Sequence, residues 1–186
     1  MKILIVVDMQ NDFINGSLAN EDAQKIVDKV AQKIEERRNQ GYEIIFTRDT
    51  HGENYLSTME GKNLPVKHCI MGTDGWEIIK ELSVLDALII DKPTFGYIGL
   101  GDAIRELAAE PKNLEEVELI GVCTDICVVS NALLLKAMLP ETRICVDEKC
   151  CAGISKESHE AAITTMKMCQ IDMRLFQVLC KQKKLI

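Results

Sequence analysis

Short apolar runs alternate with amphipathic stretches along most of the chain. Residues 2–7 form a β-branched run of the kind that a strand buried on both faces presents, and Asp8 closes it. From Ala23 to Ile34, apolar residues recur at i, i+3, i+4, i+7, i+8 and i+11, which predicts an amphipathic helix. Gly41 is placed to end this helix as the residue after its C-cap.

The same patterns predict a regular succession of strands and helices. Further strands are predicted at residues 42–47, 85–91, 117–122, 143–146 and 172–176. Further helices are predicted at residues 76–82, at 102–109, from Thr124 or Asp125 to 139, and at 156–169. This alternation favours an α/β fold, a three-layer doubly wound sandwich with a mainly parallel six-stranded sheet. Residues 48–75 form a polar segment, and loops of this length are usually functional or disordered.

Composition narrows the class of protein. The chain has 186 residues and 47% hydrophobic content, which suits a single domain over residues 1–186. Its net charge of −7 argues against nucleic acid or a membrane surface as a partner. No stretch approaches the ~18 apolar residues of a membrane-spanning helix. The first apolar run is too short for a signal peptide, so we expect a cytoplasmic protein.

Eight cysteines are an unusually high number for such a chain. They lack the paired C-x-x-C spacing of zinc sites, and a reducing compartment keeps thiols free. We therefore expect them to be reduced and mostly buried.

Reactive side chains follow several of the predicted strands. Asp8, Lys92 and Cys127 come after three different strands, and parallel strands bring their carboxyl ends to one edge. A helix N-terminus and a nearby lysine would favour the thiolate form of Cys127, and Asp8 could accept its proton. Taken singly, Cys127 could instead be a small buried hydrophobe, Asp8 could satisfy loop amides, and Lys92 could be a surface lysine paired with Asp91. Their joint placement predicts a nucleophilic site.

A second group of residues has the chemistry of metal ligands. Asp49, His51 and His68 lie in or beside the long polar segment, and such nitrogen and oxygen ligands suit zinc, iron or manganese. The alternative is a pair of solvated loop histidines without a metal. The third histidine, His159, lies in a polar helical segment and is interpreted as a solvated side chain.

Four sequence segments resemble the isochorismatase-like cysteine hydrolases, the superfamily that contains nicotinamidases. DMQNDF, beginning at Asp8, resembles the D-x-Q-x-D-F opening of that family, and GVCTDICV, beginning at Gly121, resembles its nucleophile turn. TRDTH, beginning at Thr47, and PVKHCIMGT, beginning at Pro65, look like the metal segments of nicotinamidases. The four motifs occur in the family's order.

The resemblance implies an amide hydrolase that forms a covalent thioester. By this similarity Asp8 would be the general base, Cys127 the nucleophile, and Lys92 the residue that orients and stabilises the charged pair. The family carries a cis peptide bond in its nucleophile turn, which here would join Val122 and Cys123. The backbone amides of Cys123 and Cys127 would form the oxyanion hole.

The resemblance also implies a divalent metal, zinc before iron or manganese, held by Asp49, His51 and His68. This metal would bind the pyridine nitrogen of nicotinamide, and Phe13 would stack on the ring. Some family members have a further histidine after the Asp-x-His segment, which this chain lacks, so the fourth ligand is left unassigned.

The function expected from the resemblance is therefore conversion of nicotinamide and water to nicotinate and ammonia. The alternatives are hydrolysis of another small amide, carbamoyl or ureido compound, or a non-catalytic homologue that binds a metal or ligand. Because members of the family often form dimers or tetramers, a homo-oligomer is expected as well.

Overall fold

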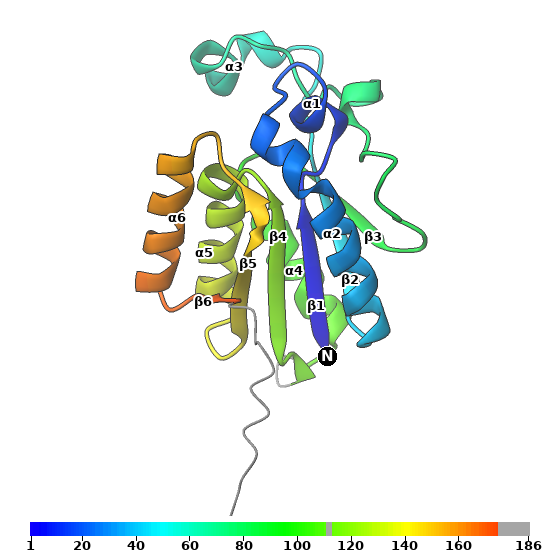
Figure 1. Ribbon diagram of the computed structural model, residues 1–186, viewed down its shortest axis with the longest axis vertical. Helices are drawn as coiled ribbons and strands as arrows, with labels where there is room; N and C mark the ends of the chain where they lie inside the picture. Colours follow the sequence, from blue (N-terminus) through cyan, green and yellow to red (C-terminus); the bar gives the residue numbers. More distant parts are fainter. Residues whose placement is uncertain (111–112, 175–186) are drawn as a thin grey trace, which may run out of the picture.

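The computed structural model describes residues 1–110 and 113–174, and these form three layers with a parallel sheet in the middle (Figure 1). The six strands of the described chain are ordered β3-β2-β1-β4-β5-β6, and every neighbouring pair is parallel. The strands are β1 (Lys2–Val7), β2 (Glu43–Asp49), β3 (Leu88–Lys92), β4 (Glu116–Val122), β5 (Arg143–Ala152) and β6 (Asp172–Met173). The predicted fold class is confirmed, with a sheet that is entirely parallel.

Helices cover both faces of this sheet, as the alternation of side chains in β1 shows. The helices are α1 (Asn11–Ile14), α2 (Glu21–Asn39), α3 (Met59–Asn63), α4 (Ile98–Ala108), α5 (Val129–Met138) and α6 (Lys156–Met168). Ile3, Ile5 and Val7 pack in one core with residues of α4, α5 and α6. Leu4 and Val6 point the other way and pack in a second core with residues of α2. A strand buried on both faces explains the unbroken apolar run that predicted it.

Helix α2 matches its prediction and has a clear start signal. The side-chain oxygen of Asn20 accepts a hydrogen bond from the backbone amide of Asp22 at 2.8 Å, which satisfies one of the free amides of the first turn. The buried face of α2 carries the residues whose spacing predicted the helix, Ala23, Ile26, Val30 and Ile34.

The helix predicted at residues 76–82 is wrong. Here the chain makes a 3₁₀ turn at Asp74–Trp76 and then runs extended, with an isolated antiparallel bridge between Gln10 and Ile78. The backbone amide of Ile79 donates to the carbonyl of Met9 at 3.0 Å and the carbonyl of Glu77 accepts from the amide of Asn11 at 2.9 Å, so the extended part of this segment pairs with distant residues. Ile79 and Leu82 are buried against the α2 side of the sheet, which accounts for the apolar spacing.

Other boundaries differ by less. Strand β5 extends to Ala152, beyond the predicted end at residue 146, and the long polar segment contains α3 together with two 3₁₀ turns. The last predicted strand is present at Asp172–Met173, while residues 175 and 176 lie outside the described part of the chain. Among the cysteines that the structure describes, all seven are free; Cys169 is exposed and the others are buried, as expected.

The strand order places a switch point at the middle of the sheet. The chain passes from β1 to β2 and β3 on one side, and β4 then pairs with β1 on its other side. Ligands of open α/β sheets bind beyond the carboxyl ends of the strands at such a point. In Figure 1 these ends point toward α1 and α3, at the top of the view.

Candidate active site

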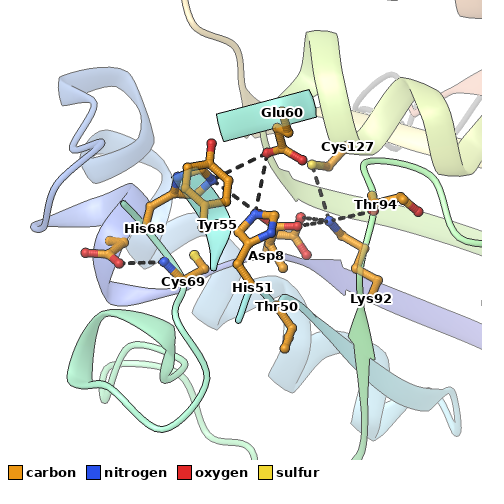
Figure 2. A network of polar contacts seen from close by, with 12 residues as sticks. Asp8, Thr50, His51, Tyr55, Glu60, His68, Cys69, Lys92, Thr94 and Cys127 are labelled. Carbon is orange, nitrogen blue, oxygen red and sulfur yellow. Dashed lines mark hydrogen bonds and ion pairs between the residues drawn. The ribbon is translucent and has the colours of Figure 1, made fainter. Parts of the chain in front are cut away.

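Three of the predicted reactive residues meet at the switch point. Lys92 ends β3, and its Nζ lies 2.7 Å from Asp8 Oδ2 and 3.4 Å from Cys127 Sγ. Figure 2 shows the lysine amine between the carboxylate and the sulfur. Lys92 and Asp8 are fully buried and Cys127 nearly so, which rules out the interpretation of Lys92 as a surface residue paired with Asp91. Asp91 instead pairs with Arg48.

Asp8 is held in place by strand β2. The hydroxyl of Thr47 donates to Asp8 Oδ1 at 2.6 Å, and the backbone amide of Asp8 donates to the carbonyl of Thr47 at 3.2 Å. Asp8 has a φ of 50°, in the left-handed region that few non-glycine residues adopt. These contacts leave Oδ2 facing Lys92.

Burial shifts the pKa values of Cys127, Asp8 and Lys92. It raises the pKa of the Cys127 thiol well above its usual range; Asp8 and Asp49 add to this effect, while Lys92 opposes it. Burial also raises the pKa of Asp8, again against the influence of Lys92. Burial alone would lower the pKa of Lys92, but Asp8, Cys127 and Asp49 outweigh it, so the lysine stays charged. Burial therefore opposes the thiolate expected from the sequence, while Lys92 favours it.

The turn that carries Cys127 depends on close packing. The Val122–Cys123 peptide bond is cis, as the resemblance implies. Gly121 has a φ of 115°, and a Cβ at this position would lie 2.1 Å from the carbonyl oxygen of Val7, so only glycine fits. On the far side of the turn, the side-chain amide of Asn131 donates to the carbonyl of Cys127 at 2.8 Å.

Two expectations about this turn are wrong. Neither Thr124 nor Asp125 caps a helix: a π-helical turn, Thr124–Val128, precedes α5, and the Asp125 carboxylate accepts from the amide of Ile154 at 3.1 Å. His159 was expected to be solvated, but its Nδ1 lies 2.8 Å from the hydroxyl of Thr124. These contacts join the segment before α6, and α6 itself, to the turn, a tertiary relation that spacing along the chain does not reveal.

The predicted metal ligands converge beside the cysteine. His51 Nε2 lies 3.0 Å from Asp49 Oδ2, and His68 Nε2 lies 3.5 Å from the same oxygen. Figure 2 shows the two imidazoles beside each other, with ring centroids 4.8 Å apart. The other nitrogen of His68, Nδ1, lies 2.8 Å from the carbonyl of Val66, which fixes the ring so that Nε2 faces inward. All three side chains are buried, so the alternative of solvated loop histidines is wrong.

Glu60 of helix α3 joins these three residues. Its Oε1 lies 3.5 Å from His51 Nε2 and 3.7 Å from His68 Nε2, and the four ligand atoms all lie within 4.8 Å of one another. Oε1 is buried and has no hydrogen-bond partner. The four separations between a carboxylate oxygen and an imidazole nitrogen are 3.0–3.7 Å, close enough for one ion to contact all four groups.

Electrostatics links the metal ligands to Lys92. The Nζ of Lys92 lies 3.1 Å from Asp49 Oδ1, while Asp49 Oδ2 faces the histidines. Burial would raise the pKa of Asp49, but its hydrogen bonds with His51 and His68 and the charge of Lys92 hold that pKa below its usual range. Asp49 is therefore an anion shared by the two clusters.

A cavity of about 580 Å³ opens onto both clusters. Cys127, Asp49, Glu60 and His68 contribute to its wall. Phe13 also lines it, with its ring centroid 5.8 Å from that of His68, in a position to contact a flat ligand.

Comparison with known proteins agrees with this geometry. The family model described as "Isochorismatase domain" matches residues 2–175. The chain belongs to the isochorismatase family. Its helices give no sign of a membrane span: within the described chain, none combines the required length and apolar character.

Named relatives of this isochorismatase-family hydrolase include nicotinamidases. It is 25% identical over 185 residues to the nicotinamidase/pyrazinamidase of Mycobacterium tuberculosis, covering 93% of this chain and 98% of that protein. The pyrazinamidase of Pyrococcus horikoshii, solved in complex with zinc, is 31% identical with a TM-score of 0.78, covering 94% and 99% of the two chains. The Streptococcus mutans pyrazinamidase/nicotinamidase is 28% identical with a TM-score of 0.82, covering 94% and 100%.

Glu60 is the site residue that the sequence did not reveal. A signal was present, because a fourth ligand was missing and two acidic residues, Glu53 and Glu60, lie between the metal histidines. The pattern could not choose between them. In the structure Glu53 pairs with Lys67 at the surface, whereas α3, begun by a Thr58 cap, carries Glu60 inward.

Proposed function

We propose that this protein is a metal-dependent cysteine amidohydrolase that converts nicotinamide and water to nicotinate and ammonia. The observation that carries the proposal is the position of Lys92, whose amine contacts Cys127, Asp8 and the metal-ligand candidate Asp49 at once. The contact supports a site in which Cys127 is the nucleophile and Asp8 its base, next to the candidate metal ligands. Similarity to proteins named nicotinamidase favours the substrate.

The reaction begins with transfer of the Cys127 proton to Asp8. Sγ then attacks the carboxamide carbon, and the C–N bond breaks as the leaving nitrogen takes the proton from Asp8, which gives ammonia and a thioester. Asp8 next removes a proton from water, the resulting hydroxide attacks the thioester, and the proton returns to sulfur as the carboxylic acid is released. The amides of Cys123 and Cys127 would stabilise the oxyanion in both steps.

Lys92 assists because its charge acts on the forming thiolate. The neutral thiol gains little from an ammonium 3.4 Å away, whereas the thiolate gains a charge-assisted contact between two buried groups. Proton transfer from Cys127 to Asp8 also weakens the ion pair of Asp8 with Lys92, so the lysine shifts its interaction from oxygen to sulfur.

Asp49, His51, Glu60 and His68 would hold the divalent ion, which when bound supplies a Lewis acid for the pyridine nitrogen. Zinc is favoured because a similar structure was solved with it, and iron or manganese also suits these ligands. Phe13 would contact the ring and keep its carboxamide directed at Cys127.

The test is ammonia release from nicotinamide by purified protein after dialysis against each metal. Wild type should release ammonia, and Cys127→Ala should lower kcat by at least about 10⁴-fold because the covalent route is lost. Cys145→Ala removes another buried thiol, on β5 away from the cavity, and should retain activity.

Each other outcome has a defined meaning. No ammonia from any metal-loaded wild type would overturn the proposal and favour a non-catalytic homologue. Undiminished activity in Cys127→Ala would overturn the thioester route. Release from carbamoyl or ureido compounds, with none from nicotinamide, would assign a different substrate to the same chemistry.

A further inference from the structure

The cavity has two chemically different ends. At the inner end lie Asp49, His68 and Cys127. The outer end is lined mainly by apolar side chains from the segment before α2, the first turn of α2, the cysteine turn and the segment before α6, namely Leu18, Ala19, Ala23, Ile126 and Ile154, together with Ser17 and Asn20. The reaction proposed above uses only the inner end.

The outer wall is fixed by hydrogen bonds. The side-chain amide of Asn20 donates to the carbonyl of Gly153 at 2.7 Å, which ties the segment before α2 to the segment before α6. Asp125 accepts from the backbone amide of Ile154 and holds that residue against the cysteine turn. These two hydrogen bonds hold the segments of the outer wall together.

Large apolar side chains remain exposed on the cavity wall. Ile154 is 62% exposed, Phe95 43% and Leu64 38%. Grouped exposure of this kind marks a surface that something else covers. Because these side chains line the same cavity as the reactive cysteine, the ligand of that cavity is the partner that would cover them.

Charge and size restrict this ligand. Among the described residues that line the cavity there is no lysine or arginine, and its charged members, Asp49 and Glu60, are acids. An anionic substituent at the outer end, away from the candidate metal ligands, would therefore meet no lysine or arginine there. A volume of about 580 Å³ lies in the range that holds drug-sized ligands, and a single pyridine ring with a carboxamide fills only part of it.

We infer that the preferred substrates are heteroaromatic carboxamides whose ring carries a neutral, apolar substituent, with Leu18, Ala19 and Ile154 forming the subsite for it. This inference rests on the proposed amidohydrolase function and specifies its substrate class. Each methylene buried there should raise kcat/KM by up to about fourfold relative to unsubstituted nicotinamide.

The experiment compares kcat/KM for nicotinamide with that for nicotinamides carrying a propyl or a carboxylate group at each free ring carbon in turn. At least one propyl compound should exceed nicotinamide by about tenfold or more, and every carboxylate compound should fall below it. In Ile154→Ser the ratio of the best propyl compound to nicotinamide should fall at least about threefold. Met168→Ser changes an apolar residue of α6 that is also exposed but is not part of the cavity wall, and it should leave the ratio unchanged.

The outcomes separate the two proposals. If neither nicotinamide nor any derivative is hydrolysed, the amidohydrolase function fails. If nicotinamide is hydrolysed but every propyl compound is slower, or a carboxylate compound is preferred, only the subsite is overturned. A ratio that does not change in Ile154→Ser, in a protein that keeps its wild-type Tm, would also overturn it.

Discussion

At the scale of single residues, the Lys92 ammonium has more potential hydrogen-bond acceptors around it than N–H groups to donate. The ammonium carries three N–H groups, while Asp8, Asp49, the carbonyl of Thr94 and Cys127 all lie between 2.7 and 3.4 Å from Nζ. The sulfur contact is the longest of the four. The attraction between Lys92 and Cys127 strengthens most when the sulfur becomes negative. The lysine therefore stabilises the transition state more than the resting thiol.

Replacing Lys92 should change the pH profile as well as the rate. Burial raises the pKa of Asp8 and Lys92 lowers it, so Lys92→Met should raise it further. Activity requires Asp8 as a carboxylate and is lost as pH falls through its pKa. The acid limb of kcat/KM should therefore lie above pH 3.8 in wild type and move to higher pH in Lys92→Met, with kcat lowered about 10²–10⁴-fold.

Stopped or coupled assays of ammonia release over pH 4–9 would measure both effects, with circular dichroism to confirm that the variant is folded. A merely structural lysine would lower the amount of folded enzyme and leave the acid limb in place. An unmoved limb in folded Lys92→Met would contradict the role given to its charge.

At the scale of elements, a buried ion pair fixes α2 to the central strand β4. Arg37 Nε donates to Glu118 Oε2 at 2.5 Å and Nη2 donates to Oε1 at 3.2 Å, and the Glu118 side chain is fully buried. Two parallel bonds define a register between helix and strand that apolar contacts alone leave freer. This places the start of α2, and with it Asn20, against the outer wall of the cavity.

Removing one partner of this ion pair should lower the free energy of unfolding more than replacing both partners with apolar residues. Glu118→Ala removes the buried carboxylate from Arg37, leaves it only the half-exposed Glu36, and should lower the free energy of unfolding by about 3–5 kcal/mol. The double variant Arg37→Met/Glu118→Leu should recover part of that loss. Urea denaturation measures both, with Glu35→Ala as control, because Glu35 pairs with Arg38 at the surface and should change stability by less than about 1 kcal/mol. A loss below 1 kcal/mol in Glu118→Ala would contradict the account.

The elements also show what a sequence can and cannot predict. Strand β1 and helix α2 were predictable because their own residues provide the buried faces and the start and stop signals. The extended conformation of residues 77–79 was not predictable, since its backbone hydrogen bonds and its bridge are formed with residues 9–11. In the site, Asp8, Lys92 and Cys127 followed from the rule for strand ends, whereas Glu60 and the contact of His159 with Thr124 depend on how distant segments pack.

At the scale of the whole molecule, strand order explains why a lysine completes the site. β1 and β4 are neighbours, with Val7 opposite Gly121, so Asp8 and the Cys127 turn are adjacent without long side chains. β3 is separated from β1 by β2, and two strand spacings amount to roughly 10 Å. Only a long side chain spans this distance, and one that ends in an ammonium also neutralises the carboxylates of Asp8 and Asp49.

The metal ligands likewise join distant parts of the fold, and metal removal should therefore lower global stability. Glu60 comes from α3, a helix of five residues that is too short to be stable alone, while Asp49 ends β2. Zinc at 100 times its Kd stabilises the folded state by about 2.7 kcal/mol. For a protein of this size, that corresponds to a Tm about 5–10 °C above the chelated form. Hydrogen exchange on chelation should rise most in residues 55–64.

Glu60→Gln tests the coupling directly. Loss of this carboxylate should weaken zinc binding by at least about tenfold, so the rise in Tm at the same zinc concentration should be roughly half that of wild type. Glu53→Gln removes a carboxylate from the same segment, at a residue that pairs only with Lys67 at the surface, and should keep the full response. Calorimetric titration with zinc and thermal scans measure both variants. If Glu60→Gln binds zinc as tightly as Glu53→Gln, α3 is not tied to the sheet through the metal.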